Sequence, residues 1–74
     1  MSRKEMNIQV KIGNRIKEIR EKQGLTQNEL SIKTDINRTF LIHMEKGRKN
    51  ISIQTLQKVI IGFDVPFKYF FRDL

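Results

Sequence analysis

Residues 26–47 read TQNELSIKTDINRTFLIHMEKG, and this stretch decides the fold. Thr26 and Glu29 match the helix capping box, in which the threonine hydroxyl accepts a hydrogen bond from the Glu29 amide and the Glu29 carboxylate accepts one from the Thr26 amide. Asn37 is a favourable N-cap for a second helix, and Gly47 is a favourable residue just beyond its end. The stretch therefore predicts two short helices joined by a tight turn.

An amphipathic helix is predicted upstream of this pair. Ile8, Ile12, Ile16 and Ile19 recur at the spacing of a single helical stripe, and Gly24 supplies a C-terminal stop. The basic residues of the segment lie off this stripe and are expected in water: Lys11, Arg15, Lys17 and Lys22.

Two further helices are predicted downstream, after the basic loop at 48–50. Ser52 is a favourable N-cap for the fourth helix, and Pro66 suits the first turn of the fifth. Apolar residues keep helical spacing in the fourth helix, at Leu56, Val59, Ile60 and Phe63. No segment alternates like a strand. We therefore predict an all-α, compact five-helix domain spanning residues 1–74, with residues 1–6 frayed.

Size and composition restrict the possible classes of protein. The chain has 74 residues, a net charge of +7 and no cysteine. A domain this small buries only about 60% of its unfolded surface, so dimerisation often supplements its stability. The absence of cysteine fits a reducing compartment. No signal peptide is evident, and no stretch approaches the roughly 20 apolar residues of a membrane span. A cytoplasmic domain is expected.

The residue inventory gives little support to enzyme chemistry. The chain has one histidine, no cysteine, no glycine-rich phosphate loop and no paired carboxylates at a plausible site. His43 lacks partners at metal-ligand spacing. We therefore expect no catalysis, no cofactor and no metal. The basic excess favours an anionic partner, with nucleic acid as the first candidate and an acidic membrane surface as the second.

The second helix of the pair carries residues suited to reading DNA bases. Arg38 and Thr39 occupy its first turn, and His43 lies on the same side one turn later. Arginine can donate two hydrogen bonds to guanine, and threonine offers a hydroxyl and a methyl group. A solvated surface is the alternative, but the capped helix before and the basic loop after favour DNA reading. Phe40 has two interpretations, core packing or contact with a sugar or thymine methyl. Ile42 is expected to pack or to make a dimer contact rather than to read a base.

Phosphate contacts are expected from groups around this helix. The N-terminus of the preceding helix offers free amides and attracts anions. From position 33 to position 49 the chain has five basic residues and two acidic ones. The residues assigned to phosphate binding are Gln27, Lys33, Lys46, Arg48, Lys49 and Asn50.

The C-terminal segment, PFKYFFRDL at 66–74, holds four of the six aromatic residues. Such a concentration exceeds what a small core is expected to absorb, so a self-associating patch would cover the surplus. We predict that residues 65–74 dimerise the chain, through a patch of Ile61, Phe67, Phe70 and Phe71. The alternative is that these rings complete the core of a monomer.

The run from residue 12 to residue 66 resembles the helix-turn-helix of phage repressor and Cro-type regulators. The resemblance is carried by IREKQGLTQNEL at 19–30, by INRTFL and MEKG at 36–47, and by the S-x-x-T-L-x-K-V pattern at 52–59. NRTF followed by KGRKNIS is most similar to the controller proteins of restriction–modification systems. This similarity implies a small homodimeric regulator that binds palindromic sites upstream of its own gene and the endonuclease gene.

The resemblance also implies roles for individual residues. The base-reading places of the family fall on Arg38, Thr39 and His43, and its phosphate-binding places fall on Gln27, Lys49 and Asn50. Arg20 and Glu45 match a structural ion pair that links the first helix to the third.

The chain departs from the family pattern at several positions. Phe40 replaces the usual tyrosine and so lacks a phenol hydroxyl, and Ile42 stands where a small polar residue is commoner. Ser31 and Thr34 replace alanine where two helices approach, but both are small enough to fit. Lys49 replaces arginine and cannot make the planar bidentate grip.

The sequence thus predicts a homodimeric, sequence-specific transcriptional regulator that binds a palindromic double-stranded operator. Its expected location is the bacterial cytoplasm, on the nucleoid. RNA polymerase is a further expected partner if the regulator activates transcription. One alternative is an antitoxin or a phage repressor that uses the same motif and binds a protein partner with its aromatic tail. A cationic membrane-surface peptide is disfavoured, because the apolar stripe of the first helix is needed for the core.

Overall fold

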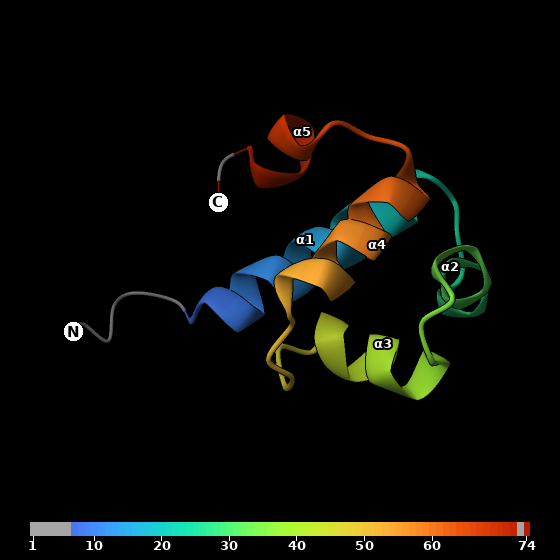
Figure 1. The fold of residues 1–74 in the computed structure, drawn as a ribbon, viewed down its shortest axis with the longest axis horizontal. Coiled ribbons are helices and arrows are strands. Elements are labelled where there is room, and N and C mark those ends of the chain that lie inside the picture. Colours follow the sequence, from blue (N-terminus) through green and yellow to red (C-terminus); the bar gives the residue numbers. More distant parts are fainter. Residues whose placement is uncertain (1–6, 73) are drawn as a thin grey trace.

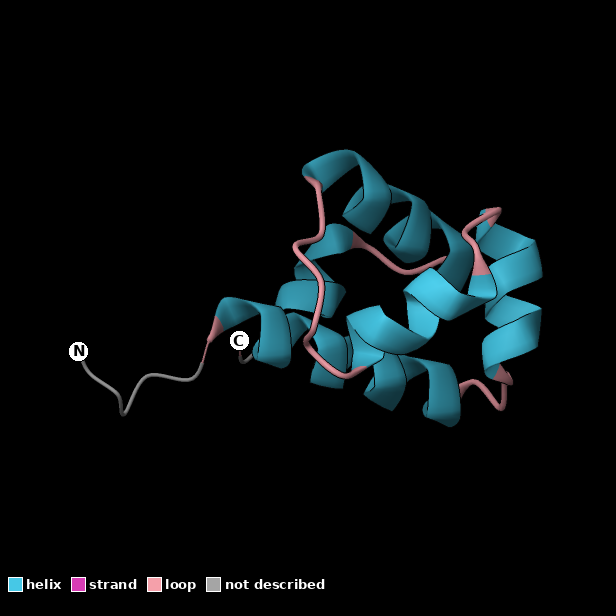
Figure 2. Ribbon diagram, turned by 90° about the horizontal axis from the view of Figure 1, so that it is seen from below, coloured by secondary structure: helices cyan, strands magenta, loops and turns pink. Residues whose placement is uncertain are grey.

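The computed structural model describes residues 7–72 and 74, and these form five helices joined by short loops (Figure 1). Their bounds are α1 (Ile8–Lys22), α2 (Gln27–Thr34), α3 (Arg38–Glu45), α4 (Ile53–Phe63) and α5 (Phe67–Phe71). No strand occurs in this described part of the chain, and Figure 2 shows only helices and loops. The predicted all-α, five-helix fold is confirmed. The fraying predicted for residues 1–6 lies outside the described residues.

Four of the five helices begin at a side-chain cap. The capping box predicted at α2 is complete, because the Glu29 amide donates to Thr26 Oγ1 at 3.0 Å and the Thr26 amide donates to Glu29 Oε1 at 2.8 Å. Asn37 caps α3 by accepting from the Phe40 amide at 3.1 Å. Ser52 caps α4, and Asn7 caps α1 in the same way. Each cap satisfies an amide that has no partner inside its helix.

The helix ends are also set locally. Gly24 and Gly47 follow α1 and α3 with φ of 72° and 73°, a backbone region that only glycine enters without a steric penalty. Asp35 and Asp64 take the left-handed conformation after α2 and α4. Pro66, predicted for the first turn of α5, is instead the residue just before that helix.

The helices arrange so that α1 and α4 lie side by side, while α3 crosses at one edge and α5 covers the opposite edge (Figure 1). The core between them consists of Ile16, Ile19, Leu30, Ile36, Leu41, Met44, Leu56, Val59, Ile60, Phe63 and Phe70. Ile8, predicted for the buried stripe, is 60% exposed because it starts α1 beyond the reach of the other helices. Within the described residues, no helix is both long and apolar enough to cross a membrane.

Small residues let the helices approach closely at two places. A side chain at Gly13 of α1 would collide with the backbone carbonyl oxygens of Met44 and Glu45, so this glycine brings α3 against α1. Gly62 of α4 likewise leaves room for the methyl group of the buried Thr34 on α2. Thr34 therefore fits its close contact, as the sequence predicted.

Candidate nucleic-acid interface

Helix α3 presents its two faces to different surroundings. Leu41, Met44 and Glu45 are buried against the other helices, whereas Arg38 and Thr39 are exposed in its first turn. His43 lies one turn later and is half-buried. The structure thus puts the two strongest base-reading candidates at the exposed N-terminal end of a rigidly packed helix, the geometry that a DNA-reading helix requires.

Phe40 is half-buried and packs against the edge of the hydrophobic core. The Lys49 ammonium lies over its ring, 6.0 Å from the centroid, at the outer limit of a cation–π contact. The ring therefore serves the scaffold and also lies beneath one of the predicted phosphate-binding side chains. Ile42 is half-buried, in agreement with a packing role.

The loop after α3 carries exposed basic groups at Lys46, Arg48 and Lys49. It is tied to the start of α1, because the Gln9 side-chain amide donates to Asn50 Oδ1. Gly47 packs directly on Val10 of the same helix, with no space for a side chain. The loop is thus anchored beside α3 while its cations face solvent.

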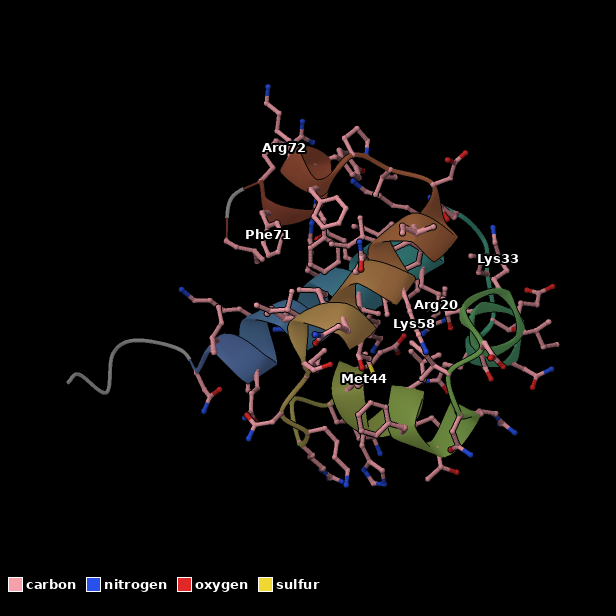
Figure 3. The ribbon with its side chains drawn as sticks, in the orientation of Figure 1. Arg20, Lys33, Met44, Lys58, Phe71 and Arg72 are labelled. Atoms are coloured by element: carbon pink, nitrogen blue, oxygen red, sulfur yellow. The ribbon has the colours of Figure 1, made fainter. Side chains whose placement is uncertain are left out.

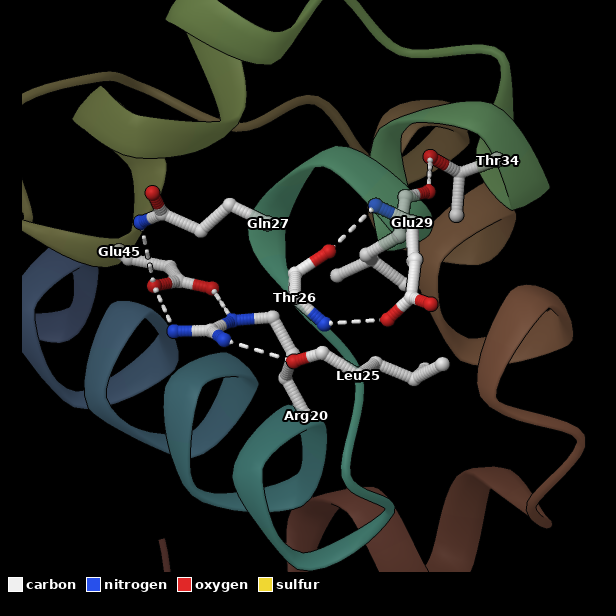
Figure 4. A network of polar contacts seen from close by, with 8 residues as sticks. Arg20, Leu25, Thr26, Gln27, Glu29, Thr34 and Glu45 are labelled. Carbon is white, nitrogen blue, oxygen red and sulfur yellow. Dashed lines mark hydrogen bonds and ion pairs between the residues drawn. The ribbon is translucent and has the colours of Figure 1, made fainter.

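A buried ion pair joins α1 to the end of α3 (Figure 4). Arg20 Nε donates to Glu45 Oε2 at 2.6 Å, and Arg20 Nη2 donates to Glu45 Oε1 at 3.1 Å. The third nitrogen, Nη1, donates to the Leu25 carbonyl at 2.8 Å in the loop before α2. The Glu45 carboxylate raises the pKa of Arg20, chiefly through the hydrogen bond between them. The pair expected from the resemblance is therefore present, and it fixes three elements at one point.

Gln27, a predicted phosphate contact, belongs to the same network. Its Nε2 donates to Glu45 Oε1 at 3.1 Å (Figure 4). An amide nitrogen carries two hydrogens, so one donor is left at the N-terminus of α2 for an anion. Gln27 thus has a structural partner that the sequence did not predict.

Lys33 is not brought together with the other predicted phosphate contacts. It extends from α2 in the direction away from α3 (Figure 3). There it lines a shallow groove between α2 and α4 together with Lys58, Ile61 and Asp64.

The C-terminal rings divide between core and surface, which corrects one prediction. Phe70, assigned to the dimer patch, is 0% exposed and fills the monomer core, because it is the residue of α5 that faces inward. Phe67 and Phe71 lie four residues apart on the same helix and are 49% and 42% exposed. Ile61 is exposed on α4. Phe70 is thus part of the monomer core, whereas Phe67 and Phe71 remain exposed for the predicted dimer contact.

Arg15 is a second correction. It is only 7% exposed, although the pattern of α1 predicts it in water. Its Nε donates to the Phe70 carbonyl at 2.7 Å, and its guanidinium also donates to the Tyr69 carbonyl. A signal was available, since Arg15 lies three residues after Ile12 and four before Ile19, on the edge of the apolar stripe.

The helix-turn-helix family matches residues 16–70, most of the chain. The chain belongs to this family. This helix-turn-helix protein is 30% identical over 69 residues to the control protein C.MunI of a Mycoplasma species, with 92% of this chain and 93% of that protein covered. The resemblance to restriction–modification controller proteins is confirmed, and the family is one of DNA-binding regulators.

Solved structures of controller proteins share the fold of this helix-turn-helix protein. The tetramer of C.Esp1396I in complex with its natural 35 base-pair operator matches with a TM-score of 0.85 and 31% identity, covering 90% of this chain and 88% of that one. C.AhdI from Aeromonas hydrophila matches with a TM-score of 0.81 and 28% identity, covering 85% of this chain and 96% of that one.

Proposed function

We propose that the chain is the controller protein of a restriction–modification system, a homodimer that binds palindromic operators of its own gene and the endonuclease gene. The observation that carries the proposal is the exposure of Arg38 and Thr39 in the first turn of a helix whose other face is buried. The operator complex of C.Esp1396I supports the same mode of binding. Two copies of α3 would enter successive major grooves about 34 Å apart.

Each side chain of the interface has a role in this proposal. Arg38 donates to a guanine, Thr39 contacts a base edge or a thymine methyl, and His43 reads at the periphery because it is half-buried. Phe40 supports Lys49 rather than reading bases. The phosphate contacts are Gln27, Lys46, Arg48, Lys49 and Asn50; Lys33 lies apart from them.

The second copy is recruited through apolar groups that the monomer leaves exposed. Phe67 and Phe71 occupy one side of α5, and Ile61 is exposed on α4. Covering such side chains is favourable by about 25 cal/mol per Å² of apolar surface. We place the dimer on the nucleoid, and RNA polymerase is its further partner wherever the regulator activates transcription.

Arg38→Ala tests the reading role. Operators are recovered by selection from a randomised duplex pool, and affinities for the selected and a scrambled duplex are measured by fluorescence anisotropy. Loss of a bidentate contact should cost about 1–3 kcal/mol on the selected duplex and much less on the scrambled one, so the ratio of affinities falls. An unchanged ratio would remove Arg38 from the reading surface.

Two further variants make the Arg38 experiment specific. Lys49→Ala should weaken both duplexes similarly and reduce the slope of log affinity against log salt by about one, because one phosphate contact is lost. Lys17→Ala removes the same charge from the exposed face of α1 and should leave both the ratio and the slope unchanged. If Lys17→Ala acted like Lys49→Ala, the effect would be one of net charge alone.

A further inference from the structure

The end of α5 is gripped by a side chain from the other end of the sequence. Arg15 of α1 donates from Nε to the Phe70 carbonyl at 2.7 Å and from Nη2 to the Tyr69 carbonyl. Its guanidinium carbon also lies 4.9 Å from the centroid of the Tyr69 ring. Arg72 approaches the same ring at 5.0 Å. Arg15 therefore holds both the backbone and a side chain of α5.

Helix α5 needs such a partner because it is weak by itself. It has five residues, and its N-cap, Pro66, makes no side-chain capping bond. A helix this short is unstable in isolation, and no amide within the helix donates to its last carbonyls. Apart from Arg15, the Tyr69 carbonyl accepts from the Arg72 amide just beyond the helix, at 3.3 Å. A cation at those carbonyls supplies two hydrogen bonds and interacts favourably with the C-terminal end of the helix dipole.

The chemistry of arginine suits this position. The planar guanidinium presents donors in a fixed fork, so one group can reach adjacent carbonyls. Its remaining nitrogen, Nη1, donates to Glu18 Oε1 at 3.0 Å, which balances the charge on α1 itself. With the side chain buried, every nitrogen of the guanidinium has a partner.

We propose that Arg15 is a positioning residue for homodimerisation. By fixing the C-terminal end of α5, it holds Phe67 and Phe71 at the surface while Phe70 stays in the core. Figure 3 shows Phe71 and Arg72 together at the end of this helix. The inference rests on the proposed homodimer, because it assigns Arg15 to the presentation of the surface that a second copy covers.

The test is the dimer dissociation constant of Arg15→Met, measured by sedimentation equilibrium on the full chain. Loss of hydrogen bonds from a charged donor should weaken association by about 10- to 100-fold. Arg15→Lys keeps the charge but not the fork, so it should fall between the wild type and Arg15→Met. Lys17→Met, which removes a charge from the exposed face of α1, should dimerise like the wild type. Wild-type dimerisation by Arg15→Met would overturn the proposal.

A second readout separates positioning from general loss of fold. At protein concentrations above its own dissociation constant, Arg15→Met should bind the selected duplex with wild-type salt dependence, because α3 is unaltered. A variant that is simply unfolded would gain nothing from concentration, and that result would also overturn the proposal.

Amide hydrogen exchange distinguishes loss of the Arg15 contacts with α5 from loss of the dimer. The Tyr69 and Phe70 amides donate to the Pro66 carbonyl, and in Arg15→Met they should exchange at least about tenfold faster. If the wild type were monomeric at all concentrations, the proposed dimer would fail, although this exchange rate would still report on Arg15. If the dimer formed but these amides exchanged unchanged, Arg15 would lose its assigned role.

Discussion

The helix pair α2–α3 and the C-terminal helix α5 are held in place by different means. Both helices of the pair begin at side-chain caps, Thr26 and Asn37, that lie within three residues of the amides they satisfy. Helix α5 has no side-chain cap, and it is held by Phe70 in the core and by the grip of Arg15. Local bonds thus shape the surface proposed to read DNA, whereas distant contacts place the surface proposed to dimerise.

This difference teaches that the two surfaces can be disturbed separately. A change in a distant contact of α5 should affect association before it affects base reading. The helix pair also depends on one distant contact, because the Glu45 carboxylate connects α3 to both Arg20 and Gln27. Local hydrogen bonds therefore set where the two helices begin, whereas a long-range ion pair holds them against α1.

The largest expected effect is that of Phe70→Ala. Emptying a fully buried phenylalanine site should reduce the free energy of unfolding by about 4 kcal/mol, as measured by urea denaturation. Phe67→Ala is the matched variant, because the ring is on the same helix and half exposed, and it should cost less than about 1 kcal/mol while weakening the dimer. Equal losses of stability in the two variants would contradict the division of α5 into core and surface.

Glu45→Ala should have the next largest effect. It should reduce the free energy of unfolding by about 3 kcal/mol, because it leaves the buried Arg20 charge without its partner. The double variant Arg20→Met with Glu45→Met removes both charges and should be more stable than Glu45→Ala. Chemical denaturation of the three proteins compares them directly. A double variant no better than the single one would mean that packing, not the unpaired charge, sets the cost.

The pH dependence of this pair has a definite sign. The pKa of Arg20 is raised in the folded state, so its contribution is fully present below the ordinary pKa of arginine and is lost only as pH rises through the raised value. The Arg20 side of the pair therefore adds no loss of stability between neutral pH and pH 9.

A smaller loss of stability than that of Glu45→Ala is expected for Thr26→Ala, which removes the hydroxyl that caps α2. The Glu29 amide would lose its acceptor, and the free energy of unfolding should fall by about 1 kcal/mol. Thr26→Ser keeps the hydroxyl and is the matched control. A loss as large as that of Glu45→Ala would show that the helix pair depends on this local hydrogen bond as much as on its ion pair with α1.

Much of the fold could be predicted because its signals are short-range. The caps at Thr26, Asn37 and Ser52 and the glycine after α3 each act within a few residues of their own position, so the sequence reveals them directly. The exposed side of α3 follows from the same spacing. Gln27 was harder, because its predicted role gave no indication that it also bonds Glu45.

The burial of individual side chains was less predictable. Periodicity shows that a helix has an apolar face, but it does not show how far a neighbouring helix covers that face. Ile8 therefore lies beyond the core that its stripe predicts, and Arg15 is buried although it was predicted in water. The same limit applies to Phe70, which is chemically indistinguishable from the exposed Phe67 and Phe71.

By itself the sequence determined where helices α1 to α4 begin and which residues α3 presents, since those features depend on bonds and spacings of three or four positions. Only the tertiary structure decided which aromatic ring enters the core and which cation anchors α5. Arg15 and the Phe70 carbonyl are 55 positions apart and meet only when α5 folds back on α1. Contacts of that range depend on the packing of the whole chain, so no local pattern encodes them.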